Sequence, residues 1–208
     1  MHSETKFPNK HFFTDTFGEP CESTLESDPV CRFHYVAKVV GLEKSDEEIL
    51  HKYSVLTTAM IPSIVDRVYA RMFEFLPMKK HFAVQHDGYY GHVPNTVDEV
   101  TLDHSQTKFR KQRLKEYLEK LGTASHDETF AVLLDVISRI HTTQQGNPML
   151  DVPLVQVTAI LGYLSEQFLS EIARISELGP NEFTKLQSAY HKLFWIQNSM
   201  FLRHYALR

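Results

Sequence analysis

Cysteine is scarce in this chain of 208 residues, which contains only Cys21 and Cys31. Two cysteines are too few for the disulfide framework that stabilises small secreted domains. The first residues, from Met1 to Lys6, also lack the apolar core of a signal peptide. We therefore expect a cytoplasmic protein with reduced thiols. Together with the nearby His34, the two cysteines match no spacing typical of zinc sites.

Long apolar runs and an excess of basic residues are also absent. No run approaches the roughly 18 apolar residues of a membrane-spanning helix, so we expect no membrane segment. The formal net charge is −4, and lysine and arginine are spread along the chain. Nucleic acid is therefore not an expected partner. A hydrophobic fraction of 42% over 208 residues is enough for one full core.

Sustained alternation of polar and apolar residues, which is typical of strands, is missing, and so is any internal repeat. Apolar residues recur instead at helical spacing through most of the chain. The sequence therefore predicts an all-α domain over residues 30–208, preceded by an irregular leader over residues 1–29. The predicted helices cover residues 30–40, 45–73 with a bend at Pro62, 96–122, 125–141, 153–175 and 180–205.

Helix starts are predicted from capping boxes, in which a cap residue and an acidic residue three positions later both bond to backbone N–H groups. The predicted pairs are Ser45 with Glu48, Thr96 with Glu99, and Ser125 with Glu128. Helix ends are predicted at Gly41 and at Gly146-Asn147-Pro148, and residues 77–95 are expected to form a loop.

His141 lies on the apolar face of the predicted 125–141 helix. The residues four, seven and eight positions earlier are Ile137, Leu134 and Leu133, and this spacing places all of them on one face. A neutral imidazole there can direct one nitrogen at a metal while the other donates to a carbonyl one turn back. A core histidine bonded to a backbone carbonyl fits the same pattern, so both interpretations stay open.

Tyr69 lies on the inward face of the predicted 45–73 helix, among Val65, Val68 and Met72. A buried hydroxyl needs a hydrogen-bond partner, and a bound diatomic ligand can supply one. The alternative is an ordinary core tyrosine bonded to a carbonyl.

Two longer segments carry a resemblance to a known family. Residues 45–82 read S-D-E-E-I-L-H-K-Y-S followed by V-D-R-V-Y-A-R-M-F-E-F-L-P-M-K-K-H-F, and residues 137–141 read I-S-R-I-H, followed by Val152-Pro153. In this order, the segments resemble the first long helices, the proximal helix and the next helix of the protoglobins, which are relatives of the globin domains in globin-coupled sensors. The resemblance covers roughly residues 30–208.

The resemblance implies a globin-like fold with an N-terminal extension, long C-terminal helices and a haem b between its distal and proximal helices. It implies that His141 is the proximal ligand of the iron and that Tyr69 is the distal tyrosine. The other residues that it places around the haem are Val68, Arg113, Leu114 and Ile137. Arg113 is a possible partner of a haem propionate because a guanidinium fits a carboxylate.

Other histidines compete for the iron or suggest a second metal site. His81, His86 and His92 lie in or beside the predicted loop, where one of them could occupy the distal position, although their spacing matches no zinc site. On the last helix, we expect His191 to be exposed and His204 to lie near a fraying end.

The last helix carries apolar residues over a wide arc, namely Phe194, Trp195, Ile196 and Phe201. A helix that is apolar around most of its circumference needs a second surface to bury it. In resembling proteins the two C-terminal helices form a four-helix bundle between two subunits, so a homodimer is expected. A thick core within one monomer is the alternative.

The resulting functional hypothesis is a haem protein that reversibly binds O2, CO or NO, as a carrier or a sensor. One alternative is a haem enzyme that acts on NO, nitrite or peroxide with an external reductant. Another is a haem-free interaction module with a globin fold, in which side chains fill the space beneath His141.

Overall fold

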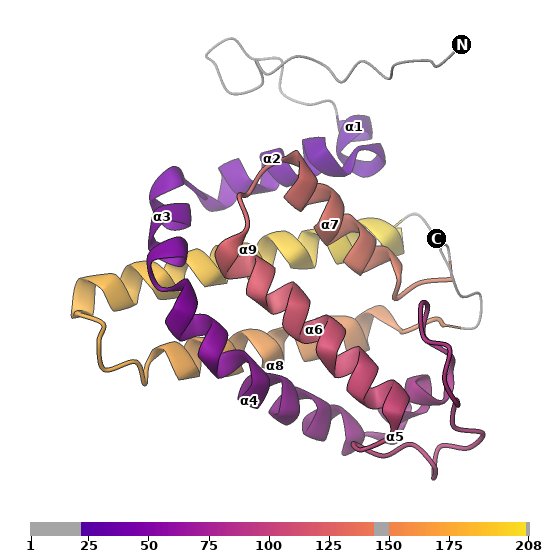
Figure 1. The fold of residues 1–208 in the computed structure, drawn as a ribbon. Coiled ribbons are helices and arrows are strands. Elements are labelled where there is room, and N and C mark those ends of the chain that lie inside the picture. Colours follow the sequence, from indigo (N-terminus) through magenta and orange to yellow (C-terminus); the bar gives the residue numbers. More distant parts are fainter. Residues whose placement is uncertain (1–21, 144–149, 207–208) are drawn as a thin grey trace, which may run out of the picture.

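A computed structural model describes residues 22–143 and 150–206, and in these ranges the chain is helical without any strand (Figure 1). The all-α prediction is therefore confirmed. The elements are α1 (Glu22–Ser27), α2 (Pro29–Val40), α3 (Lys44–Lys52), α4 (Ser54–Phe73), α5 (Leu76–Lys79), η1 (Lys80–Ala83), α6 (Ser105–Thr123), α7 (Glu128–Arg139), α8 (Leu154–Ile172) and α9 (Pro180–Ala206).

Helix α9 is the central element of the core. It runs antiparallel to α8 and also contacts α2, α3 and α7, while α4 packs along α6 (Figure 1). Its side chains from Leu186 to Phe201 include nine that are buried. Gly122 of α6 allows a close approach to α9, because a Cβ at this position would lie 2.5 Å from the Tyr190 hydroxyl. That hydroxyl donates to Thr57 Oγ1 of α4 at 2.9 Å.

The predicted 45–73 helix is divided into two helices at Tyr53. The prediction that the two helices meet at Pro62 is wrong. Tyr53 separates α3 from α4, and Pro62 lies inside α4. A proline inside a helix removes one backbone hydrogen bond. Ile61 and Ile64, on either side of it, are buried in the core, and this packing maintains the helix through the proline.

The predicted helix over 96–122 begins later, at Ser105. Glu99 accepts a hydrogen bond from Asn95 N at 2.9 Å within the preceding loop, so its carboxylate stabilises a turn there. His104 caps α6 through its Nδ1, which accepts from Gln106 N at 3.1 Å. The loop predicted over residues 77–95 is therefore shifted: α5 and η1 occupy its first part, and the loop between η1 and α6 covers residues 84–104.

Two other caps lie two residues away from the residues predicted for them. Helix α3 begins after Glu43, whose N–H donates to the Asp46 carboxylate at 2.8 Å. Helix α7 begins after Asp127, whose Oδ1 accepts from Thr129 N at 2.9 Å and from Phe130 N at 3.1 Å. Aspartate competes well with serine for the cap position, which explains the shift at α7. At α3, Asp46 is the third helical residue, and its bond to Glu43 N moves the start of the helix to Lys44.

The end of α2 follows the prediction. Gly41 adopts φ 69° and ψ 39°, in the left-handed region that favours glycine, and its N–H lies 3.1 Å from Lys38 O. The predicted helix end at Gly146-Asn147-Pro148 lies outside the described residues, as do Cys21 and most of the predicted leader. The described part of that leader contains a helix, α1, that the sequence pattern did not predict.

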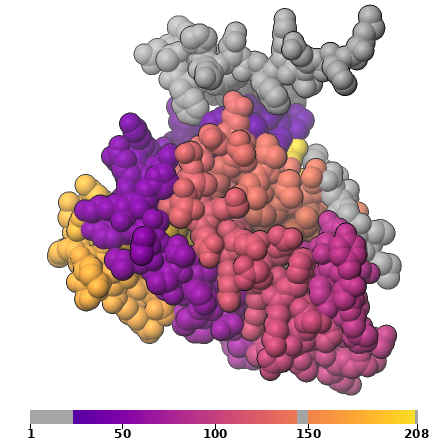
Figure 2. All heavy atoms as spheres, in the orientation of Figure 1, coloured from indigo at the N-terminus to yellow at the C-terminus, as the bar shows by residue number. Residues whose placement is uncertain are grey.

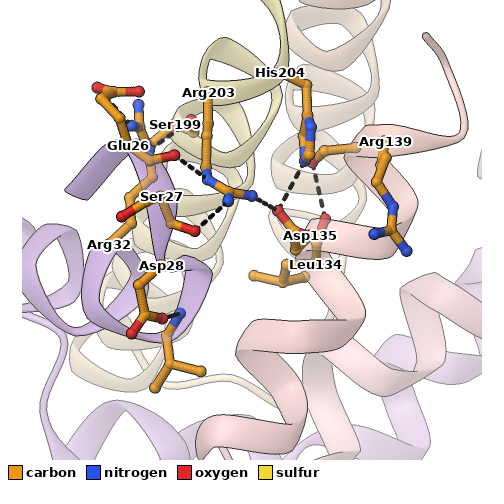
Figure 3. A network of polar contacts seen from close by, with 12 residues as sticks. Glu26, Ser27, Asp28, Arg32, Leu134, Asp135, Arg139, Ser199, Arg203 and His204 are labelled. Atoms are coloured by element: carbon orange, nitrogen blue, oxygen red, sulfur yellow. Dashed lines mark hydrogen bonds and ion pairs between the residues drawn. The ribbon is translucent and has the colours of Figure 1, made fainter. Parts of the chain in front are cut away.

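A buried polar network joins α1 and α7 to the end of α9 (Figure 3). Arg203 donates to Glu26 O and Ser27 O, each at 2.7 Å, and pairs with Asp135. His204 Nε2 lies 2.8 Å from the same Asp135 carboxylate. His204 is buried, so the expectation that it lies at a fraying end is wrong. Its burial follows from this network, which fixes the last turns of α9.

Arg32 of α2 adds a second connection between α1 and α9. Its Nε donates to Ser199 O at 3.1 Å (Figure 3), and its Nη1 donates to Leu25 O at 3.3 Å. Carbonyl groups at the end of α1 have no partner within their own helix, so the two arginines satisfy groups that would otherwise be unpaired.

Among the described residues, no helix combines the length and the apolar character needed to cross a membrane.

Asp135→Ala is expected to lower the free energy of unfolding by about 3–5 kcal/mol, because Arg203 would remain as an uncompensated buried cation. Denaturant unfolding measures this change. The matched control is Asp103→Ala: Asp103 pairs with Lys108 at 3.4 Å, and its side chain is 92% exposed. An exposed pair contributes at most about 1 kcal/mol.

The same variant should alter the acid sensitivity of the protein. Burial raises the pKa of Asp135, but the hydrogen bond from His204 and the charge of Arg203 lower this pKa by more, and the net shift is downward. The stabilisation from Asp135 is therefore present above its unfolded pKa of about 3.9 and is lost as the pH falls through the folded pKa. Wild type should lose more stability below about pH 4 than Asp135→Ala. Equal losses in the two proteins would contradict this role.

Candidate functional site

His141 lies just beyond the end of α7, which is shorter than the helix predicted over 125–141. Helix α7 ends at Arg139, and Thr142 N donates to Arg139 O at 3.0 Å. The His141 carbonyl accepts from Val152 N at 3.0 Å. The backbone of His141 is thus held on one side by the last turn of α7 and on the other by the segment that leads into α8.

The His141 ring has a defined orientation. Its Nδ1 lies 2.8 Å from Ile137 O, and because a carbonyl can only accept, Nδ1 carries the proton and Nε2 has the lone pair. Burial lowers the pKa of His141 to about 4, although the hydrogen bond to Ile137 opposes this shift. The ring is consequently neutral near pH 7, as a metal ligand must be. Phe201 of α9 packs edge-on against it, with the ring centroids 5.2 Å apart.

Tyr69 is buried on α4, next to Val68, and 5% of its surface is exposed. Its ring packs edge-on against Phe82, with the centroids 5.6 Å apart, and Lys111 Nζ lies 5.8 Å from its centroid. Burial raises the pKa of Tyr69. Its hydroxyl therefore keeps its proton at physiological pH and can donate a hydrogen bond.

Arg110 of α6 belongs to the same region, although the sequence analysis did not single it out. Burial lowers the pKa of Arg110 to about 10, while Tyr69 raises it. The charge of Arg110 in turn contributes to lowering the pKa of both Tyr69 and His141. The guanidinium is thus close enough to both residues to influence them. Helical spacing could have indicated its burial, because Arg110 lies four residues before Leu114 and shares its face.

The remaining predicted site residues differ in their burial. Ile137 supplies the carbonyl that orients His141, and Leu114 is partly buried against the core. Arg113 faces the solvent: its side chain is 57% exposed, and its Nη1 pairs with Glu116 at 3.0 Å. It also lies over the Phe109 ring, with Cζ 5.1 Å from the centroid.

The loop histidines form other contacts. His81 Nε2 lies 3.0 Å from Gln156 Oε1 of α8, and His86 Nδ1 lies 2.6 Å from Asp87 O. Within residues 22–143 and 150–206, no three His, Cys, Asp or Glu side chains lie together in a way that could hold a metal ion. A single histidine as the only protein ligand of a haem iron is compatible with that result.

Two hollows on the described surface have volumes of about 440 Å³ and about 390 Å³, and neither is lined by His141 or Tyr69. The larger one lies between α4 and α6 and is lined mainly by charged side chains, including Asp66 and Lys111. Figure 2 shows the face on which α6 lies between α4 and the loop that precedes it. Phe82 packs directly against Tyr69, and Phe201 packs directly against His141. Both phenylalanine rings must therefore shift if a planar cofactor is to enter between Tyr69 and His141.

Three features of the site suit a haem. The Nε2 of a neutral, oriented imidazole is a common iron ligand. A buried and protonated tyrosine such as Tyr69 can donate a hydrogen bond to a polar ligand. Arg110 Nε is buried and has no hydrogen-bond partner among the described residues, and such an atom suits the carboxylate of a propionate.

A sequence model of the family described as Protoglobin matches residues 31–207 of the chain. A search of curated proteins found no match to the chain.

Proposed function

Because this chain belongs to the protoglobin family, whose members are haem-binding globins, we propose that it binds a small gas reversibly through a haem b held by His141. The gas is O2, CO or NO, and the protein acts as a carrier or a sensor. The observation that carries the proposal is the 2.8 Å hydrogen bond from His141 Nδ1 to Ile137 O, because this bond leaves Nε2 as the atom that can ligate iron.

The haem would supply an iron centre that binds diatomic gases, and the protein would control access to it and its polarity. Ile137 orients His141, as partners of metal-ligating histidines commonly do. Val68 and Leu114 supply apolar surface that keeps water from the bound gas. The Tyr69 hydroxyl would donate a hydrogen bond to a polar ligand such as O2, and the exposed Arg113 would pair with a haem propionate.

A haem-free interaction module is the second candidate, and one observation favours it. Phe201 contacts the His141 ring and Phe82 contacts the Tyr69 ring, so side chains occupy the immediate surroundings of both residues. A haem enzyme that acts on NO, nitrite or peroxide would use the same site together with an external reductant. Steady turnover with such a reductant would distinguish it from a ligand-binding globin.

We also propose a homodimer formed through α8 and α9. Phe194, Ile196 and Phe201 are buried within the monomer, so they do not need a partner subunit. Trp195 and Leu202 are exposed by 54% and 38%, and their seven-residue spacing places them on one face of α9. The exposed positions of α8 include Val155, Ala159 and Gly162. Interface cores are depleted of charged residues, and these outward positions fit that composition.

His141→Ala should abolish or strongly alter the absorption spectrum of the protein after reconstitution with haemin. In wild type, we expect an intense Soret band that shifts upon reduction and upon addition of carbon monoxide. His191→Ala is the matched control, because His191 is exposed on α9, and its spectrum should equal that of wild type. A wild-type spectrum in His141→Ala would assign the iron to another histidine. The absence of haem uptake by wild type would overturn the gas-binding proposal.

Tyr69→Phe should weaken O2 binding by about tenfold, which is the loss expected for one hydrogen bond to a polar ligand. CO is less polar when bound, so its affinity should change much less. Flash photolysis measures both affinities in the reconstituted protein. Tyr35→Phe serves as the control, since Tyr35 is 40% exposed on α2. Equal changes for O2 and CO would contradict a hydrogen-bonding role for Tyr69.

Trp195→Glu should convert the protein from dimer to monomer in sedimentation velocity experiments, because it places a charge at the centre of the proposed interface. Tyr90→Glu is the matched control, since Tyr90 is 93% exposed in the loop before α6. A wild-type protein that sediments as a monomer would refute the proposed dimer.

A further inference from the structure

Arg110 is a buried cation whose hydrogen bonding is incomplete. The residue is 9% exposed, its Nη2 donates to Val84 O at 2.7 Å, and its guanidinium lies over the Phe82 ring at 4.8 Å from the centroid. Its Nε is buried and has no hydrogen-bond partner among the described residues. A guanidinium presents its donors in a planar fork, so one side of this fork is available for an acceptor.

The charge of Arg110 is also not neutralised within the described part of the chain. No carboxylate there forms an ion pair with it. The titratable groups that its charge influences are Tyr69, His81, His86 and His141, and none of them is an anion at neutral pH. Buried charges are normally paired, because burial of an unpaired charge is costly. A bound anionic ligand would remove this cost.

The attachment of the loop does not explain the presence of a charge at this position. Gln106, one turn earlier on α6, donates from Nε2 to Phe82 O at 2.8 Å and to Val84 O at 3.1 Å. Its Oε1 accepts from His86 N at 2.9 Å. A neutral side chain therefore already holds the segment from Phe82 to His86 against α6. The contact from Arg110 to Val84 O adds to this attachment, but it needs no positive charge.

We propose that Arg110 is an anion-binding residue of the haem site and that its Nε donates to an oxyanion. The inference rests on the proposed haem binding. Two anions share this chemistry: the carboxylate of a haem propionate, and a small oxyanion such as nitrite that enters to reach the iron. Arg110 is better placed for this role than Arg113, whose side chain is 57% exposed and already paired with Glu116.

The first experiment compares the thermal unfolding of Arg110→Met with that of wild type, with and without haemin. Methionine has a similar length and no charge, so the haem-free variant should unfold at the same temperature as wild type or higher. Haemin should stabilise the variant less than wild type if the anion is part of the haem, because the ion pair is lost. A purely structural Arg110 would lower the unfolding temperature equally in both states, and that result would overturn the proposal. Arg174→Met is the control and should match wild type throughout, because the Arg174 side chain is 73% exposed and pairs with Glu171 at 2.9 Å.

The second experiment identifies the source of the anion from two comparisons. The first compares the affinities for haemin and for haemin dimethyl ester, and the second compares the nitrite affinities of Arg110→Met and wild type. If Arg110 binds a propionate, wild type should prefer haemin over haemin dimethyl ester by about tenfold, and Arg110→Met should lose this preference. If Arg110 binds a small oxyanion, the ferric variant should bind nitrite about tenfold more weakly, with its haemin preference and its CO affinity unchanged. Arg110→Lys should retain part of either effect, because it keeps the charge but not the planar fork.

The possible failures are distinguishable. If wild type takes up neither haemin nor its ester, the proposed function fails, and the role of Arg110 fails with it. If wild type takes up haem, but Arg110→Met changes neither the haemin preference nor the nitrite affinity, the anion-binding role of Arg110 alone is refuted.

Discussion

Helix α9 is buried over most of its circumference and exposes one face, which carries His191, Trp195 and Leu202, and the burial of its other faces arranges the remaining helices. Helices α2, α3, α7 and α8 all pack against it. Gln197 in its middle is fully buried and donates to Ser138 Oγ of α7 at 2.8 Å. Because a buried amide must find a partner, this bond fixes the position of α7 along α9. The end of α7, and with it His141, is thereby placed against Phe201.

The polar network around Asp135 complements this apolar packing at the end of α9. Hydrophobic contacts are non-directional and tolerate some sliding between helices, whereas hydrogen bonds to Asp135 are satisfied in only one alignment of α7 and α9. Arg203 extends the same network to the carbonyls of α1 (Figure 3). Packing therefore supplies most of the attraction between these helices, and the polar contacts determine their alignment.

Helical periodicity predicted the features that are determined within a single segment of the chain. It placed His141 and Tyr69 on inward faces and Gly41 at a helix end. It could not indicate contacts between distant segments, such as those of His204 and Arg203 with Asp135. It also could not decide between neighbouring capping residues, since Asp127 and Ser125 are chemically similar caps. Arg110 could not be predicted as a site residue, because helical spacing places it on the face of Leu114 but does not identify the partner of a buried charge.

The two sides of the candidate site are held by different kinds of contact. His141 is fixed by its backbone, by Ile137 O and by a core helix, so its ring has little freedom. On the Tyr69 side, Gln106 and Arg110 donate to the carbonyls of Phe82 and Val84, and Gln106 Oε1 accepts from His86 N. The Tyr69 side therefore depends on contacts between a few side chains and a loop, whereas the His141 side depends on the packing of two core helices.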